Sequence, residues 1–159
     1  PDIHVGSALP AINAPDQNGI THNFSDLSGE KGLILVMSRS FDWCPFCIRQ
    51  LKQLVDAEAE FNALGFNVTT MTYDSVATLK VAEEEYEISF PALHDENSAF
   101  IKTLGILNAQ YEPGNRAYGI PYPGIFVVDG QGIIRAKLAE ADYRDRPDFS
   151  LVLEEARKL

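Results

Sequence analysis

The two cysteines of the chain, Cys44 and Cys47, are the residues whose type and spacing most directly indicate chemistry. They lie in a Trp-Cys-Pro-Phe-Cys motif at residues 43–47, after an apolar run at residues 32–37 and before an amphipathic helical pattern. We therefore expect Cys44 at a helix N-terminus, where unpaired backbone N–H groups and the helix dipole stabilise a thiolate. Cys47, one helical turn further on, lies on the same face and is close enough to form a disulfide. The motif predicts redox chemistry.

Two other interpretations of the cysteine pair stay open at this point. A non-catalytic module could carry a metal on the two thiolates and a histidine, although His4, His22 and His94 are scattered singly and do not form a zinc-binding pair. Two inert buried thiols are the other alternative. We expect no metal and no cofactor other than a redox-active disulfide between Cys44 and Cys47.

The residues around the pair suggest how it would work. We expect Cys44 to be the exposed nucleophile and Cys47 to face inward and resolve the mixed disulfide. Pro45 and Phe46 would tune the redox potential and contact substrate, and Pro45 stands where a helix tolerates proline. Trp43 is expected to form a flat rim for substrate beside the site, and a tryptophan of the core is the alternative.

Charged residues near the motif act in opposite directions. Arg39 and Arg49 would lower the pKa of a thiol, whereas Asp42 would raise it. Arg116, in the long loop before a late proline, is a candidate for polarising a peroxide or stabilising the Cys44 thiolate, and a surface arginine is the alternative.

A basic cluster near the C-terminus is a further candidate. Tyr143, Arg144 and Arg146 could contact an anion or a substrate. A solvated loop tied by ion pairs to Asp142 and Asp145 is our default interpretation of this segment.

Composition limits the kind of partner. The chain has 159 residues, enough for one domain spanning residues 1–159, and a formal net charge of −10. This charge disfavours nucleic acid and anionic membranes as partners. No apolar stretch reaches the ~18 residues of a membrane span. The compartment stays open between the cytoplasm, which we favour slightly, and export after removal of a signal peptide.

Strand and helix patterns alternate along the chain. We expect an N-terminal hairpin around Asn18-Gly19, a polar loop at residues 25–29, a strand buried on both faces at 33–37, and a helix from Cys44 to Leu64. The other expected elements are strands at 66–73, 90–93, 125–128 and 133–138, helices at 76–86, 98–104 and 149–159, and a loop at 108–121 that can line a site. This order predicts an α/β fold in which helices cover both faces of a central sheet.

The motif between a buried strand and a long helix, together with Pro123 before an apolar strand, resembles the thioredoxin superfamily nearly end to end. The stretches F-S-D-L-S-G at 24–29 and F-V-V-D-G-Q-G at 126–132 resemble its redoxin branch, which includes the alkyl hydroperoxide reductase/thiol-specific antioxidant (AhpC/TSA) proteins. P-Y-P at 121–123 and D-Y-R-D-R at 142–146 resemble the peroxiredoxin-like members. The resemblance implies a thioredoxin-like fold with a mixed central sheet and an added N-terminal hairpin.

The same resemblance implies a role for a proline. Thioredoxin-like proteins place a cis-proline against the disulfide at the position of Pro123, which would turn backbone groups of Tyr122 toward the cysteines to bind an extended substrate. A trans-proline at the end of a loop is the alternative.

The chain also departs from its relatives. Peroxiredoxins carry P-x-x-x-[TS]-x-x-C before the reactive cysteine, and the matching positions before Cys44 are Met37 and Phe41. The hydroxyl that orients peroxide and an arginine at the usual place before the late strand are missing on this alignment. Thioredoxins have a buried acid six residues before the first cysteine, where this chain has Ser38.

These observations favour a dithiol oxidoreductase on a peroxiredoxin-like frame. The leading hypothesis is thiol-disulfide exchange through Cys44 and Cys47, with protein or small-molecule disulfides as substrates and an external thiol as electron donor. The first alternative is a peroxiredoxin-like thiol peroxidase with an antioxidant role, in which Cys44 reacts with peroxide and Cys47 resolves. The second is the non-catalytic metal-binding module.

Overall fold

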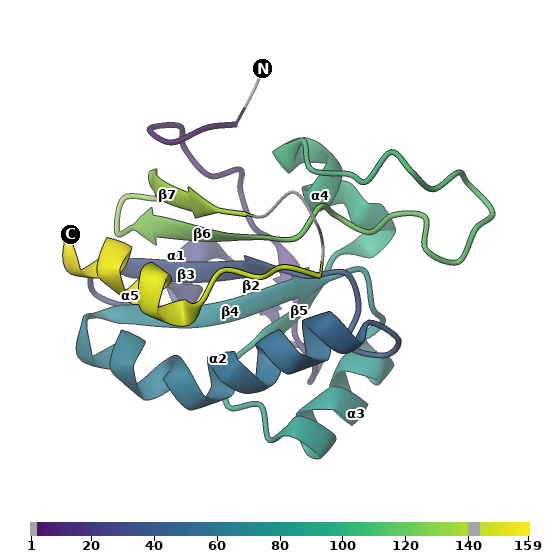
Figure 1. Ribbon diagram of the computed structural model, residues 1–159, viewed down its shortest axis with the longest axis horizontal. Helices are drawn as coiled ribbons and strands as arrows, with labels where there is room; N and C mark the ends of the chain where they lie inside the picture. Colours follow the sequence, from purple (N-terminus) through teal and green to yellow (C-terminus); the bar gives the residue numbers. More distant parts are fainter. Residues whose placement is uncertain (1–2, 140–143) are drawn as a thin grey trace.

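A five-stranded mixed sheet organises the protein (Figure 1). The computed structural model describes residues 3–139 and 144–159. The strand order is β5-β4-β3-β6-β7. The strands are β3 (Gly32–Met37), β4 (Phe66–Thr72), β5 (Ala92–His94), β6 (Gly124–Asp129) and β7 (Ile134–Leu138). Strands β3, β4 and β5 run parallel, whereas β6 and β7 are antiparallel to their neighbours, which confirms the predicted mixed sheet.

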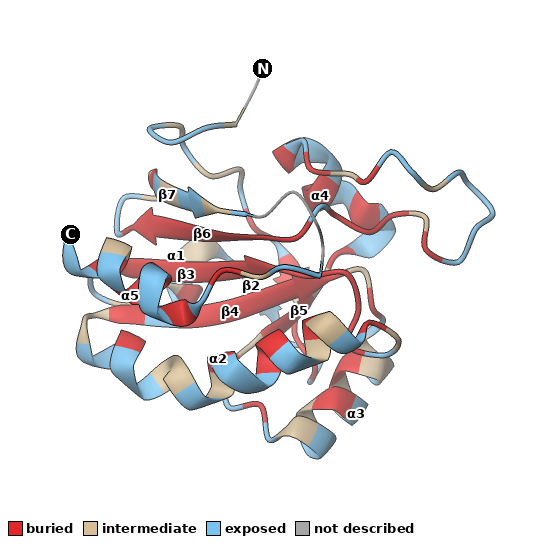
Figure 2. Cartoon of the chain, in the orientation of Figure 1, coloured by how far each residue is buried: buried red, intermediate tan, exposed pale blue. Residues whose placement is uncertain are grey.

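Strand β3 lies at the centre because all six of its residues are buried. Leu33, Leu35 and Met37 pack into the core on one face of the sheet, and Ile34 and Val36 pack into the core on the other. An uninterrupted apolar run is typical of a strand covered on both faces. The same pattern extends over β6, and both strands are buried throughout in Figure 2.

Helices cover both faces of the sheet, as predicted. On one face α2 (Pro45–Ala63), α3 (Val76–Tyr86) and α5 (Phe149–Arg157) contribute to the same apolar cluster. On the other face α4 (Ala99–Leu104), the N-terminal segment and the short helix α1 (Phe24–Leu27) form a second cluster. The cysteines belong to the first cluster, so α2 carries the redox motif into the packed layer between helix and sheet.

Most predicted elements are confirmed with small shifts at their ends, and two predictions need correction. The predicted N-terminal hairpin is present as β1 (Ala14–Pro15) and β2 (Thr21–His22). The predicted polar loop that follows it contains α1 instead, because Asn23 and Asp26 form a reciprocal capping box. The strand predicted at 90–93 is β5 at 92–94, since Pro91 has no N–H to donate to the ladder. A 3₁₀ turn at Glu96–Ser98 precedes α4.

The long connection between α4 and β6 projects from the sheet, as the trace in Figure 1 shows. Its base is closed by a hydrogen bond from the Asn108 N–H to the Ile120 carbonyl at 2.9 Å and by a bridge between Leu107 and Pro121. Within residues 3–139 and 144–159, no helix combines the length and the apolar character needed to cross a lipid bilayer.

A histidine between two carboxylates ties the hairpin to α1. His22 Nε2 lies 2.7 Å from Asp16 Oδ2, and Nδ1 lies 2.5 Å from Asp26 Oδ1. Burial opposes charging of His22, but the hydrogen bonds to both carboxylates outweigh burial and raise its pKa. Burial also disfavours the charged form of Asp16, but its hydrogen bonds with His22 and with backbone N–H groups outweigh burial and lower its pKa.

We predict that His22→Gln destabilises the protein most at intermediate pH. The raised pKa of His22 gives stability that is present below about 6.5 and lost as pH rises through the folded-state pKa. The lowered carboxylate pKa values give stability that is present above about 3.9 and lost as pH falls. Denaturant unfolding of the native chain and the variant at several pH values measures the difference. His4→Gln is the control, and an equal His22→Gln effect at every pH would contradict the prediction.

Candidate active site

The loop between β3 and α2 is held by a buried carboxylate at the end of β4. Asp74 accepts a hydrogen bond from the Ser40 hydroxyl and another from the Phe41 N–H, both at 2.7 Å. Burial raises the pKa of Asp74, although these hydrogen bonds oppose the rise. The loop therefore delivers the chain to α2 in a fixed conformation, with Cys44 as the N-cap residue and Pro45 in the first turn.

Both sulfurs lie inside the protein. Cys44 is 1% exposed and Cys47 is fully buried, and both are free thiols joined by a hydrogen bond. The Cys47 sulfur also accepts hydrogen bonds from the backbone N–H groups of Arg39, at 3.3 Å, and Ser40. The prediction that Cys44 is exposed is wrong, because the first turn of α2 is packed into the apolar cluster that faces the sheet.

A cation reaches the pair from the segment that precedes α5. Arg146 Nη2 lies 3.2 Å from Cys47 Sγ and 4.0 Å from Cys44 Sγ. Its other terminal nitrogen, Nη1, donates to Gln50 Oε1 at 3.2 Å. We expected a solvated loop here, and the structure instead brings Arg146 into the site. Gln50 was missed by the sequence analysis, although its position one turn after Cys47 places it on the same face of α2.

The charges assign the thiolate to the second cysteine. Burial disfavours ionisation of Cys47, but the hydrogen bond from Cys44, the Arg146 charge and two backbone N–H groups outweigh it and lower its pKa to about 6. The hydrogen bond to Cys47, followed by burial, raises the pKa of Cys44. These contacts favour a thiolate on Cys47, whereas we expected it on Cys44. The helix terminus acts on both thiols, whereas the additional donors converge on Cys47.

Trp43 lies beside the pair and is flanked by two arginines. The guanidinium carbons of Arg39 and Arg116 lie 5.2 and 5.5 Å from its ring centroid. Its indole N–H donates to the Tyr73 hydroxyl at 2.9 Å, and that hydroxyl donates to the Arg116 carbonyl at the same distance. Arg39 also donates to the Tyr111 hydroxyl. Arg116 is exposed, as in the surface-arginine alternative, and its guanidinium flanks the half-buried Trp43.

The predicted cis-proline is absent, since no described residue follows a cis peptide bond. Pro123 is buried at the start of β6. The Tyr122 N–H donates to the Ile106 carbonyl at 2.6 Å, so this backbone group is already used within the protein. The Tyr122 side chain is 47% exposed. The trans form is the ordinary state of an X-Pro bond, and here it lets the chain pair with the segment after α4.

The remaining predicted residues lie in the first turns of α2 and in the segment before α5. Pro45 is exposed and Phe46 is half-buried, with the Arg49 guanidinium 5.4 Å from the Phe46 ring centroid. Arg144 is exposed and lines a cavity of about 300 Å³ together with Phe46, Arg49 and Arg146. Tyr143 lies outside the described residues.

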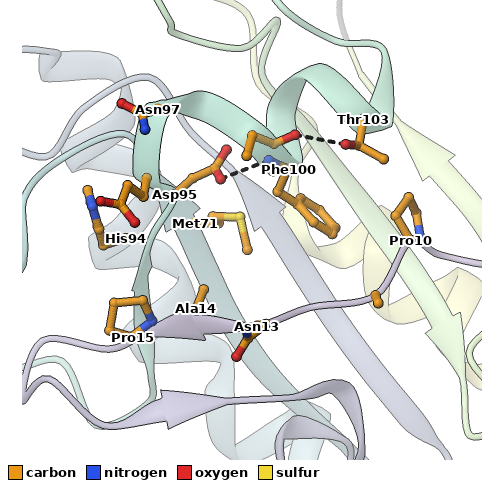
Figure 3. Close-up of a pocket in the computed structure, with 13 residues that line it drawn as sticks. Pro10, Asn13, Ala14, Pro15, Met71, His94, Asp95, Asn97, Phe100 and Thr103 are labelled. Atoms are coloured by element: carbon orange, nitrogen blue, oxygen red, sulfur yellow. Dashed lines mark hydrogen bonds between the residues drawn. The ribbon is translucent and has the colours of Figure 1, made fainter.

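A cavity of about 560 Å³ lies on the opposite face of the sheet. Figure 3 shows it between the N-terminal segment at residues 10–15 and α4, with Met71 and Phe100 in its wall. Neither cysteine lines this cavity. In the part of the chain that the structure describes, no three His, Cys, Asp or Glu side chains form a group that could hold a metal ion. The metal-binding module therefore lacks a third ligand among these residues.

Comparison with known sequences identifies a family. The sequence model of the AhpC/TSA family matches residues 5–137. Alkyl hydroperoxide reductase E of Mycobacterium tuberculosis is 28% identical over 135 residues, which are 84% of this chain and 83% of that protein. Peroxiredoxin 2 of Sulfuracidifex metallicus is 25% identical over 133 residues, 80% of this chain. The chain spans only 59% of that relative and 52% of peroxiredoxin bcp1 of Schizosaccharomyces pombe.

Comparison with solved structures agrees with the fold. Peroxidoxin BcpB of Mycobacterium tuberculosis superposes with a TM-score of 0.84 at 18% identity, covering 99% of this chain and 98% of that one. A peroxiredoxin-like protein of Aquifex aeolicus gives a TM-score of 0.82 at 17% identity, covering 99% and 88%. The thioredoxin-like architecture is therefore confirmed.

We predict that Arg146→Gln raises the pKa of the reactive thiol from about 6 toward the ordinary value of roughly 8.5. The substitution removes the charge that stabilises the Cys47 thiolate. Thiolate absorbance near 240 nm, followed against pH in the reduced protein, measures the shift. Arg49→Gln removes an exposed arginine from α2, the helix that carries Cys47, and is the control. An unchanged titration in Arg146→Gln would contradict the assignment.

Gln50→Glu provides a second test of the same contact. A carboxylate at this buried position would pair with Arg146 and weaken its effect on the sulfur, so we expect the thiol pKa to rise. Gln50→Met keeps position 50 uncharged, so the thiol pKa of this variant should stay nearer that of the native chain. A lower thiol pKa in Gln50→Glu would mean that Arg146 does not control the thiolate.

Proposed function

The chain belongs to the AhpC/TSA family, and from that membership we propose that it is a thiol peroxidase in which Cys47 attacks the peroxide and Cys44 resolves. This proposal exchanges the roles that the sequence suggested for the two cysteines. The peroxidase alternative is preferred to the leading hypothesis of disulfide exchange. The proposed substrates are peroxides, and the proposed electron donor is an external dithiol.

The observation that carries the proposal is the contact of Arg146 with a fully buried Cys47 sulfur, at 3.2 Å. A protein disulfide is flanked by Cβ atoms and backbone, so it needs an exposed sulfur as its attacker. The terminal oxygen of a peroxide is far smaller and needs only a narrow approach. The guanidinium can stabilise both the attacking thiolate and the negative charge that develops on the leaving oxygen.

The spacing of the family motif fits the same choice of cysteine, although its proline and its Ser/Thr are both replaced in this chain. When P-x-x-x-[TS]-x-x-C is counted back from Cys47, Ser40 stands at the proline position and Cys44 at the Ser/Thr position. The Cys44 thiol hydrogen-bonds to Cys47, as the hydroxyl of the motif would. Peroxiredoxins carry an arginine before the late strand, which this chain lacks, and here Arg146 places a cation at the sulfur instead. The missing hydroxyl and the missing arginine therefore each have a counterpart in the structure.

The proposed cycle uses the two cysteines, a peroxide and an external dithiol. The Cys47 thiolate attacks the terminal peroxide oxygen, an S–O bond forms and the O–O bond breaks. The departing alkoxide takes from the solvent the proton that Cys47 released on ionising, and it leaves as an alcohol. Cys44 then attacks the Cys47 sulfenic acid, an S–S bond forms, and hydroxide leaves as water with the thiol proton. An external dithiol reduces the disulfide by two exchange steps and is itself oxidised to a disulfide.

Disulfide exchange is the second candidate because a C-x-x-C motif stands at the start of α2 with proline in its first turn. Burial of both sulfurs and the trans Tyr122–Pro123 bond disfavour it. A side-by-side comparison of hydrogen peroxide reduction and insulin reduction, with the same dithiol recycler, separates the two. Fast insulin reduction together with oxidation by peroxide no faster than that of a free thiol would favour exchange.

We predict that Cys47→Ser abolishes reaction with hydrogen peroxide, whereas Cys44→Ser reacts once and stops at a sulfenic acid. Mass spectrometry after dimedone treatment should find the adduct on Cys47 in Cys44→Ser and a disulfide in the native chain. The rate of the first step should rise with pH through about 6 and then level off, because the thiolate is the nucleophile. A dimedone adduct on Cys44 in the Cys47→Ser variant would reverse the assignment.

A further inference from the structure

The cavity beside Arg146 opens next to the proposed reaction centre. Its volume is about 300 Å³, and it lies between α2 and residues 144–148. Helix α2 contributes Phe46, Arg49 and Gln50 to its wall. Arg146, which also lines the cavity, donates to the Cys47 sulfur. A molecule in this cavity therefore lies beside the guanidinium that also contacts the Cys47 sulfur.

The cavity is cationic in an acidic protein. Arg49, Arg144 and Arg146 line it, against the two carboxylates of Asp145 and Asp148. Asp148 is engaged as the N-cap of α5, where its side chain accepts a backbone hydrogen bond. The chain as a whole carries a net charge of −10, so its distant field repels anions. Selection of an anion therefore depends on these nearby guanidinium groups.

Arg49 is placed to recognise a carboxylate. It is exposed on α2, and its guanidinium lies 5.4 Å from the Phe46 ring centroid, in the range of a cation–π contact. A guanidinium presents two parallel N–H donors that match the two oxygens of a carboxylate. The volume lies at the lower end of the 300–1,000 Å³ that small-molecule sites occupy, so a short molecule fits.

We infer that this cavity is a subsite for the carboxylate of a short hydroperoxy acid, with Arg49 as its principal contact. The inference rests on the proposed peroxidase function and specifies its substrate class. The carboxylate binds at Arg49, and the hydroperoxide group is directed past Arg146 to Cys47. The same carboxylate recognition could serve a short thiol acid that acts as reductant, and the test below separates these two sources.

A matched pair of substrates tests the inference. The probes are 3-hydroperoxy-3-methylbutanoate and its methyl ester, which differ only in the charge of the acid group. We expect kcat/KM for the acid to exceed that for the ester by about tenfold, as one charge-assisted hydrogen bond at a partly exposed site would give. Arg49→Gln should bring the ratio close to one, and Arg49→Glu should reverse it.

Lys52→Gln is the matched control. Lys52 is exposed on the same helix, but its ammonium group lies 5.3 Å from the Tyr86 ring centroid, and it does not line the cavity. This substitution removes one positive charge from α2 without touching the subsite, so the ratio of acid to ester should keep its native value. An equal loss of the ratio in Lys52→Gln and Arg49→Gln would indicate a general field effect and overturn the subsite.

Equal kcat/KM values for acid and ester in the native chain, with hydrogen peroxide still reduced rapidly, would overturn the inference and leave the peroxidase function standing. Failure of hydrogen peroxide itself to oxidise Cys47 would instead remove the proposed function. The reductive arm uses the oxidised protein with 3-mercaptopropionate and its methyl ester. An Arg49-dependent preference for the acid in this arm alone would assign the subsite to the reductant and overturn its assignment to the peroxide.

Discussion

The contact between Arg146 and the Cys47 sulfur is the interaction on which the proposed chemistry of this protein depends. A charge removed from water is costly unless an opposite charge and hydrogen bonds replace the lost solvation. Here a fully buried sulfur has a guanidinium nitrogen at 3.2 Å and the backbone N–H groups of Arg39 and Ser40. Much of the surrounding structure keeps these donors in place.

Each element near the site has a part in holding this arrangement. Strand β3, buried on both faces, fixes where the loop before α2 begins, and Asp74 fixes the conformation of that loop. Gln50 orients Arg146 through a neutral oxygen. Because an amide carries no charge, it can position the guanidinium without neutralising it, and the positive charge stays available to the sulfur.

The fold could be predicted from sequence because its signals are local. Strand β3 is an uninterrupted apolar run, and α2 has an apolar face and ends at Ala63, shortly before Gly65. The proposed roles of the cysteines could not be predicted in the same way, because Arg146 is 99 residues from Cys47 in sequence. It also lies beyond residues 5–137, which match the family. The spacing of the cysteines indicated only a helix N-terminus, which favours a thiolate at Cys44. The positive charge beside Cys47 comes from Arg146, near the C-terminal end of the sequence.

The same contact bears on the direction of the redox reaction. Arg146 stabilises a thiolate, which exists only in the reduced protein, and a Cys44–Cys47 disulfide offers it no negative charge. Stabilising the reduced form makes a disulfide more oxidising. At equilibrium the dithiol form of such a pair is favoured over the disulfide, and a peroxidase must regain the dithiol form in every cycle. The guanidinium that activates Cys47 toward peroxide therefore also favours its regeneration, so one buried contact serves both halves of the proposed cycle.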